Sequence, residues 1–598
     1  MARRLSLVVR KVVRLVVQPK IAVLLYLGLA IASTWPLATG LTARFPRGAS
    51  QSDTVPLFNI WSLWWNADRA LHGFANYWNA PIFHPATNTF AYSEPQPMTL
   101  LVAPVVWLTG SSVLAYNLYL LLSLTLNGFI GAATLRVLRV RRAIALAGGA
   151  ALLLLPVVHW QSDVIQLMPL WPSLWTLAAL VRLSRQPRFR TGAEAGIAFV
   201  ATFLSCGHHG LFLAILLCGS GWLLIAPVLR LKTWTSWVLL GLVATLGVLP
   251  VASRLREVAE VRRFERSQDS VEKLSLLPGD YTAARGWQLV DPGLLAARAH
   301  WRMSPGFLKY ALALAGLGFG LWRRRTLRLT AFLAVFGVLA FVLSLGGNLT
   351  LFGWQPWWAI AGMVPGVDQV RNVFRFAYFV QLTVVFLAAF GASSLWCVIR
   401  CRLRASSTGN VRPIWTRVVA VALAGIFLAA TVEVLPQRPK LGYAPDAVSH
   451  ADWIAFVRDK TPPGRAVACV PFATGNQVNQ FQATMWWMFL GTEHRVPLVN
   501  GYSGFFPDEY FALRKRVNES FPDDDVLRQF DKIGVEFVLV ATRQISSDDL
   551  LIETATSPLL ELVFQGEAGV DVYRIRLPKQ QVRQAPDAAF VVDSRNAL

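Results

Sequence analysis

Carboxylates are scarce in the first half of the sequence, and the first of them follows the first apolar segment. Before Pro250 the acids are Asp53, Asp68, Glu94, Asp163 and Glu194. A carboxylate near the end of a membrane helix is costly to desolvate, so Asp53 is a candidate functional residue. In a suitable site it would act as a general base that takes a proton from a hydroxyl. A helix-end cap or a solvated loop acid is the alternative at this position.

Two arginines at the start of a later apolar segment suit an anion. Arg371 and Arg375 are four residues apart, which places both on one face of a helix. A guanidinium matches the oxygens of a phosphate, although an arginine at a helix end can also reach lipid headgroups. Spare arginines are disfavoured on the outer face of a membrane, which favours a specific anion. Arg285 is a third, weaker candidate.

Other polar and aromatic residues gather at loop or helix-end positions on the same side. Glu94, Asp163 and His84 are candidate substrate contacts, with ordinary solvated loop residues as the alternative. Trp61 and Trp65 are candidates to stack on a sugar or line a lipid groove, although anchoring at the membrane–water interface is the commoner role of tryptophan. Adjacent His208 and His209 rarely point at one ion, so we predict no metal site.

Composition indicates a polytopic α-helical membrane protein. Of 598 residues, 54% are hydrophobic and 15% are charged, whereas a soluble chain carries nearer to a quarter charged residues. The net charge of +23 does not indicate nucleic acid, because the basic residues cluster in short loops between apolar segments, the positive-inside pattern. Anionic membrane lipids are the expected partner of these loops.

The apolar segments predict about eleven transmembrane helices with a cytoplasmic N-terminus, and an odd number places the C-terminus outside. The expected spans are 21–42, 112–137, 143–159, 166–183, 193–206, 209–229, 235–252, 306–322, 327–346, 372–399 and 414–434. The pair around Gly207 is also compatible with one kinked segment. The first outer loop, 43–111, is expected to form short helices in the interface.

The composition changes after the last apolar segment. We predict a transmembrane domain over 1–435, a soluble α/β extracytoplasmic domain over 436–577 and a disordered tail over 578–598. Strands are expected at 466–471 and 536–541, with a hairpin at 560–575 and helices at 448–460 and 508–517. The five cysteines form no disulfide or metal-binding pattern.

Several stretches resemble a group of bacterial multi-pass proteins that is itself similar to GT-C glycosyltransferases. They are Asp53 with 59–65, 80–94, 115–118, 366–391 and 534–540. The resemblance implies an acid in the first outer loop that acts as the base, a polyprenyl-phosphate sugar donor and a place in the bacterial inner membrane. Many members carry two adjacent acids there, whereas Ser52 precedes Asp53 here. Some members use a divalent cation such as Mg or Mn.

The resulting hypothesis is the transfer of a hexosyl or pentosyl group to a hydroxyl of a glycan, lipid or protein acceptor on the outer face. Arg371 and Arg375 would stabilise the charge that develops on the leaving lipid phosphate. We find no Gly-rich nucleotide loop, which agrees with a lipid-linked donor. The alternative is a non-catalytic transporter or scaffold for lipid-linked glycans, although we see no internal repeat of the kind transporters show.

Overall fold

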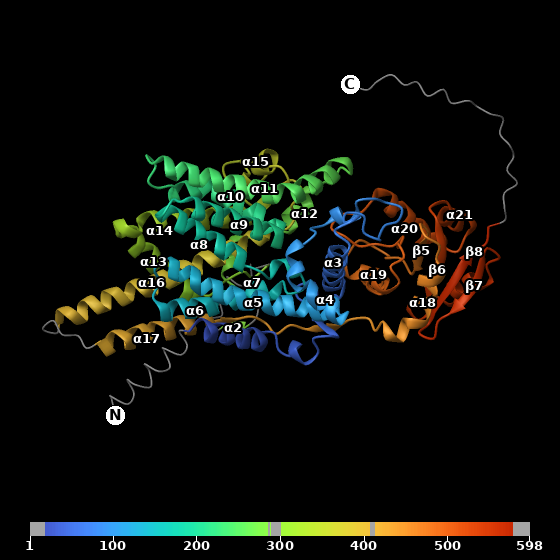
Figure 1. The fold of residues 1–598 in the computed structure, drawn as a ribbon, viewed down its shortest axis with the longest axis horizontal. Coiled ribbons are helices and arrows are strands. Elements are labelled where there is room, and N and C mark those ends of the chain that lie inside the picture. The colour runs from blue at the N-terminus through green and yellow to red at the C-terminus, as the bar shows by residue number, and fades with distance from the viewer. Residues whose placement is uncertain (1–17, 285–286, 289–300, 407–412, 578–598) are drawn as a thin grey trace, which may run out of the picture.

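The structure is a computed structural model that describes residues 18–284, 287–288, 301–406 and 413–577. Arg285, the N-terminal arm and the predicted disordered tail 578–598 lie outside the described residues. Figure 1 shows a long helical region with a mixed α/β unit at one end, and the two meet around α3 (Thr54–Leu71) and α19 (Gln482–His494).

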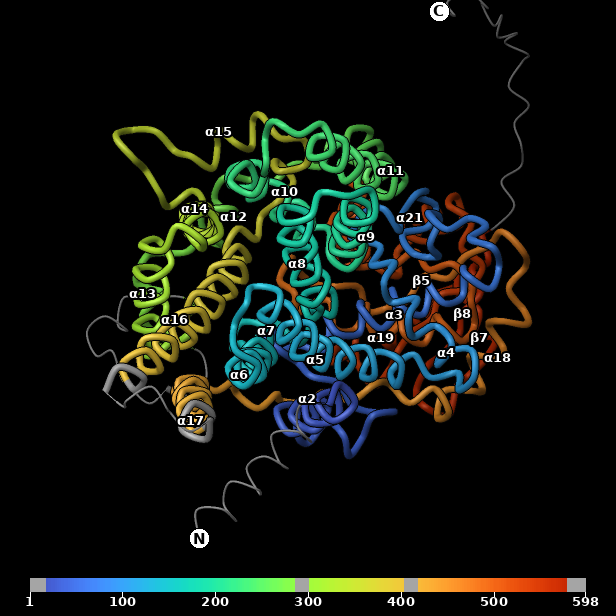
Figure 2. The backbone as a smooth tube through the Cα atoms, turned by 60° about the vertical axis from the view of Figure 1, so that its left-hand side comes forward, coloured from blue at the N-terminus to red at the C-terminus, as the bar shows by residue number. Residues whose placement is uncertain are grey.

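Each apolar segment expected to span the membrane contains a helix. These are α2 (Pro19–Ser33), α5 (Ser112–Val137), α6 (Arg142–Leu153), α8 (Trp171–Arg185), α9 (Phe189–Ser205), α10 (Gly207–Ser220), α11 (Leu231–Val261), α13 (Phe307–Trp322), α14 (Arg324–Ser344), α16 (Ala377–Ser406) and α17 (Pro413–Val432). Within the described part of the chain, six helical segments are long and apolar enough to cross a membrane, and four shorter apolar helices accompany them. The protein is therefore multi-pass, and the number eleven stays a prediction. Figure 2 shows α13, α14 and α16 grouped on one side, with α5, α6 and α8 beside them.

Glycines allow the closest helix pair, α13 and α16, to approach. A Cβ atom at Gly316 would overlap the carbonyl oxygen of Leu387, and one at Gly391 would overlap that of Leu312. In a membrane, helices associate largely by packing, so small residues at the contact allow backbones to come together. This pair fixes α16, which begins directly after Arg375, against the rest of the bundle.

The aromatic helix α3 is enclosed by protein. Trp61 and Trp65 are 2% and 5% exposed, and their rings lie parallel with centroids 6.5 Å apart. The Trp65 indole donates a hydrogen bond of 2.9 Å to the carbonyl of Tyr77. Phe90 of the first loop packs edge-on against both rings, with centroids 6.3 Å from each, and helix α19 of the C-terminal unit packs on α3. Both tryptophans are core residues here and are not open to a sugar.

The C-terminal unit is a mixed sheet covered by helices. The strand order is β5 (Ala466–Val470), β6 (Val535–Ala541), β8 (Val570–Ile575) and β7 (Leu560–Gln565). Strand β5 is parallel to β6, and the other two pairs are antiparallel. The remaining helices are α18 (Ala451–Lys460), α20 (Asp508–Ser520), α21 (Asp524–Lys532) and α22 (Asp548–Thr556). The predicted strands, hairpin and two helices are confirmed.

Backbone pairing attaches this unit to the first loop. Strand β1 (Arg44–Pro46) pairs with β4 (Leu441–Tyr443), which leads into the C-terminal unit. Farther along, the His84 N–H donates to the carbonyl of Leu498 at 2.9 Å, and the Leu498 N–H donates to that of Pro81 at 3.1 Å. Since these bonds satisfy backbone groups on both sides, the loop and the C-terminal unit form one packed body.

A buried histidine in α19 predicts an acid-sensitive C-terminal unit. Burial lowers the pKa of His494 to about 3, and its Nδ1 accepts the N–H of Val496. The unfolded chain would bind the proton more readily, so stability falls as the pH drops below 6.5. This site alone should cost about 2 kcal/mol between pH 7 and pH 5. Thermal unfolding of the full chain at several pH values, with His494→Gln for comparison, measures the effect; an equal pH slope in both proteins would contradict it.

Candidate functional site

Asp53 lies just before α3 and is held from two directions. The Arg47 guanidinium forms a bidentate ion pair with it, in which Nε donates to Oδ1 at 2.6 Å and Nη2 donates to Oδ2 at 2.8 Å. The Gln482 amide of α19 donates to Oδ2 at 3.1 Å. Behind it, Gly442 of β4 leaves no room for a side chain, because a Cβ atom there would overlap Oδ1. The carboxylate is thus fixed in direction while its side chain keeps 14% exposure.

Asp163 binds the backbone of the loop that carries Asp53. Its carboxylate accepts the N–H groups of Ala49 at 3.1 Å and Ser50 at 2.9 Å, and the residue is 1% exposed. Burial raises the pKa of this carboxyl, and the hydrogen bonds from Ser50 and Ala49 oppose that shift. The Asn59 amide of α3 donates to the Asp163 carbonyl at 3.0 Å. Asp163 therefore sets the shape of the loop that carries Asp53.

Glu94 caps a helix that begins where the chain is broken. The segment that could have been one kinked helix is two helices, because Cys206 is extended between α9 and α10. The Gly207 N–H at the start of α10 donates to Glu94 Oε2 at 3.2 Å, and His208 Nδ1 bonds Oε1. Burial alone would raise the pKa of Glu94, but His208, Arg375 and the Gly207 N–H outweigh it and lower the pKa to about 2.

Glu94, Cys206 and His208 bring one carboxylate, one thiol and one imidazole within 4.8 Å of one another. Mg²⁺ and Mn²⁺ prefer oxygen ligands, so these donors do not fit either ion. The mixture of oxygen, nitrogen and sulfur is one that zinc accepts, and these three residues would hold such an ion. The sequence did not indicate this cluster, because Glu94 lies more than a hundred residues before Cys206 and His208 in the chain.

The two arginines singled out in the sequence have no counter-charge bonded to them in the described chain; Arg375 is buried and Arg371 is half-buried. Arg375 lies in the short turn η9 (Val373–Phe376) before α16 and is 7% exposed. Neither its side chain nor that of Arg371 makes a hydrogen bond or ion pair with another described residue, and Arg375 Nε is fully enclosed. Burial lowers the pKa of Arg371. The charge of Arg375 lowers it further, whereas Tyr502 raises it. A buried, unpaired guanidinium is costly, so this arrangement is suited to an anion.

Arg266 is a further cation that the sequence analysis did not single out. It follows α11 and lies with its guanidinium 3.6 Å from the ring centre of Phe505, and it donates to the carbonyl of Gly504 at 2.8 Å. Burial and the nearby charge of Arg371 lower its pKa to about 9. Arg266 belongs to an arginine-rich run that begins at Arg254, and nothing in the sequence distinguishes it from the other arginines of that run.

The structure brings some predicted residues together and separates others. The charge of Arg375 lowers the pKa of Glu94. The charges of Arg371 and Asp163 shift the pKa of the Tyr502 phenol in opposite directions. Asp53 binds Arg47 and makes no hydrogen bond or ion pair with Arg371 or Arg375 in the described chain. His84 bonds the carbonyl of Ile533 at 2.8 Å and so joins the first loop to the C-terminal unit.

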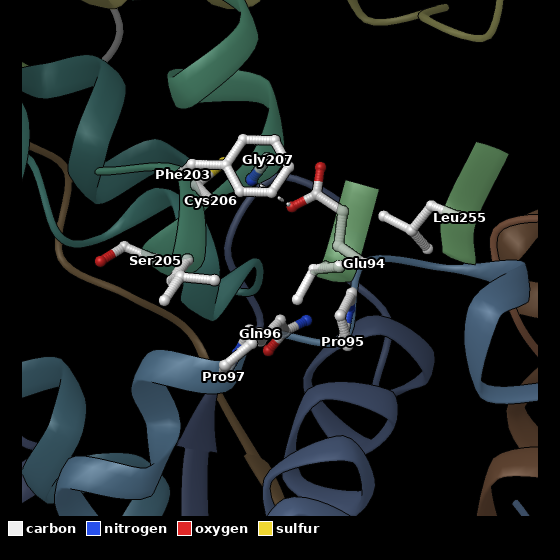
Figure 3. Close-up of a pocket in the computed structure, with 11 residues that line it drawn as sticks. Glu94, Pro95, Gln96, Pro97, Phe203, Ser205, Cys206, Gly207 and Leu255 are labelled. Atoms are coloured by element: carbon white, nitrogen blue, oxygen red, sulfur yellow. Dashed lines mark hydrogen bonds between the residues drawn. The ribbon is translucent and has the colours of Figure 1, made fainter. Parts of the chain in front are cut away.

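A small recess of about 20 Å³ lies beside Glu94. Its walls come from residues 94–97, the junction of α9 with α10, and Val251 and Leu255 of α11 (Figure 3). Most of its lining is apolar, whereas the Glu94 carboxylate and the Gly207 N–H meet at one side of it. Helix α11 carries exposed apolar side chains such as Leu242 and Leu246, as expected for a helix that contacts lipid.

Comparison with solved structures identifies the fold. The arabinofuranosyltransferase AftD from Mycobacteria aligns with a TM-score of 0.54 at 14% identity, over 94% of this chain and 42% of that chain. The chain has a GT-C-like fold. Because the alignment covers only 42% of AftD, this chain spans less than half of that protein. The likeness concerns the fold alone.

Two further GT-C structures align less closely. The Archaeoglobus fulgidus oligosaccharyltransferase has a TM-score of 0.49 at 14% identity, over 88% of this chain and 69% of that chain. ArnT from Cupriavidus metallidurans, solved bound to undecaprenyl phosphate, has a TM-score of 0.44 at 14% identity, over 92% of this chain and 97% of that chain. No family model and no curated protein sequence matches the chain.

Proposed function

We propose that this GT-C-like protein transfers a sugar from a polyprenyl-phosphate donor to an acceptor hydroxyl at the outer face of a bacterial inner membrane. The observation that carries the proposal is the pair Arg371 and Arg375, of which Arg375 is buried and Arg371 half-buried, and whose side chains bond no other described residue. A GT-C-like fold shared with an arabinofuranosyltransferase supports the same reaction class. The acceptor is a glycan, lipid or protein.

The arginines would bind the phosphate of the donor and stabilise it as it leaves. Negative charge grows on the phosphate when its bond to the anomeric carbon breaks, so fixed cations favour the transition state over the bound substrate. Arg375 belongs to η9, which packs against α14 and α16, so its guanidinium is positioned before any ligand arrives. Little reorganisation is then needed during the reaction.

The apolar tail of the donor would run along α11, which exposes Leu242 and Leu246 as a helix in contact with lipid does. The recess between α11 and the junction of α9 with α10 has a volume of about 20 Å³, which is too small for an isoprenoid chain. The tail would therefore stay on the lipid-facing side of α11 and not enter this recess.

Asp53 is the proposed base. Arg47 and Gln482 fix its carboxylate while leaving part of it exposed, which a group that accepts a proton from substrate requires. Asp163 is fully buried and bonded to two backbone N–H groups, so it acts as a positioning residue for the loop. As the acceptor oxygen attacks the anomeric carbon, its proton passes to Asp53 and the lipid phosphate departs with the bonding electrons.

Removing the Arg375 charge should weaken binding of a lipid phosphate. Farnesyl phosphate serves as the probe, with the full chain in nanodiscs. Losing a charge-assisted hydrogen bond should raise the Kd of Arg375→Gln by about tenfold to a hundredfold. The matched control is Arg256→Gln, because Arg256 is exposed and paired with Glu260. An unchanged Kd for Arg375→Gln would contradict the phosphate site.

Replacing the base should stop transfer without unfolding the protein. The donor is first identified by mass spectrometry of lipid that copurifies with the chain, and turnover is then followed on it. Asp53→Asn should lower the rate by about a hundredfold or more. Asp269→Asn is the control, because Asp269 is an exposed acid paired with Lys273. Full activity in Asp53→Asn, with an unchanged unfolding temperature, would refute the assignment.

A further inference from the structure

Three side chains that can bind a metal meet where the first loop touches the break between α9 and α10. Glu94 comes from the loop, and Cys206 and His208 stand on either side of Gly207. One ligand atom from each of the three lies within 4.8 Å of the other two. Because Cys206 is extended, with φ of −156° and ψ of 115°, α9 ends before it and α10 begins after it. This break brings Cys206 and His208 to the same carboxylate.

Hydrogen bonds orient the Glu94 carboxylate toward the other two ligands. The Gly207 N–H donates to Oε2 at 3.2 Å, and His208 Nδ1 bonds Oε1. Metal ligands in proteins are commonly held in place by such bonds from neighbouring groups. The side chains of Glu94 and His208 are 18% and 21% exposed, so an ion can reach them without unfolding of the site.

The recess beside the cluster offers room for a fourth ligand. Its volume of about 20 Å³ suffices for one water molecule, and both Glu94 and Cys206 line it (Figure 3). Gln96 lines it as well, and its Oε1 is fully buried with no hydrogen-bond partner in the described chain. A water molecule held there would donate to this oxygen. Zinc sites with three protein ligands commonly take water in the fourth position.

We propose that Glu94, Cys206 and His208 bind one zinc ion, with a water molecule in the recess as the fourth ligand. A thiolate favours zinc over magnesium or manganese, which prefer oxygen ligands. The thiolate and the carboxylate together balance the two positive charges of the ion, so it can be held in a largely buried place. Because the ligands come from two segments, the ion fixes the first loop to the junction of α9 with α10. The inference does not depend on the proposed transfer reaction.

The junction that the ion fixes also packs against the turn that carries Arg375. Phe212 of α10 stacks on Phe376, with centroids 3.8 Å apart and planes 10° apart. The ring of His209 lies 5.1 Å from that of Tyr378, so this histidine packs on α16 and does not join the cluster. Arg375 directly precedes Phe376 in the chain. Zinc binding therefore supports the part of the bundle that holds Arg375.

The test measures metal binding by the full-length protein in nanodiscs after a chelator has removed bound metal. The unaltered protein should bind one zinc ion per chain. Cobalt(II) added in place of zinc should give the charge-transfer absorption that a thiolate ligand produces. Cys206→Ala should lose this absorption and raise the Kd for zinc by about a hundredfold, because the softest of the three ligands is gone.

Cys218→Ala is the matched control, because Cys218 lies farther along α10 and is exposed. It should keep both the absorption and the zinc affinity. Glu94→Gln is a second variant, which retains a side-chain oxygen for the Gly207 N–H and should fold normally, yet bind zinc about tenfold more weakly.

Two results would overturn the inference. One is that the unaltered protein binds no zinc, and the other is that Cys206→Ala and Glu94→Gln both keep full zinc affinity. Either would show that Glu94 and His208 form a hydrogen-bonded pair without a metal. The proposed function would stand in both cases, because binding of farnesyl phosphate is measured separately.

Discussion

Burying positive charge without a bonded counter-charge is the constraint around which this site is arranged. Arg375 is almost fully enclosed, and Arg371 is close enough to repel it. Two guanidiniums in this position are tolerable because Glu94 supplies a distant negative charge and because an anion can join them. The protein keeps this arrangement in place by packing α16 against α13 through glycines.

The acids around the site divide into separate tasks. Asp53 is oriented by Arg47, Asp163 holds the loop by its backbone, and Glu94 caps α10 beside His208. None of them makes an ion pair with Arg371 or Arg375 in the described part of the chain. Each carboxylate therefore has its own partner, and the cations stay available to a ligand.

The C-terminal unit belongs to the architecture of the site. Strand pairing between β1 and β4 brings the first loop and the C-terminal unit together at Asp53. Gln482 of α19 then donates a hydrogen bond to Asp53, and Gly504 of the C-terminal unit accepts one from Arg266. Two parts that differ strongly in composition thus share one interface, where α3 is buried between them.

The sequence by itself determined the class of the protein and the kinds of residue in its site. Long apolar segments predict helices because hydrocarbon leaves the backbone no other partner, and each segment does contain a helix. The buried strands of the C-terminal unit were also predicted correctly, from their runs of apolar and β-branched residues. Asp53, Glu94, Asp163, Arg371 and Arg375 stand out because charge is rare beside membrane segments.

Only the tertiary structure decided which of these residues meet. The sequence suggested that Asp53 faces Arg371 and Arg375, whereas the fold pairs it with Arg47, which is near in the chain. Trp61 and Trp65 suggested contact with a sugar or with lipid, whereas both rings are buried and pack against Phe90 of the first loop. Arg266 and the Glu94–Cys206–His208 cluster carry no local signal. Such meetings depend on contacts between segments far apart in the chain, and these follow from packing of the whole molecule instead of from any local pattern.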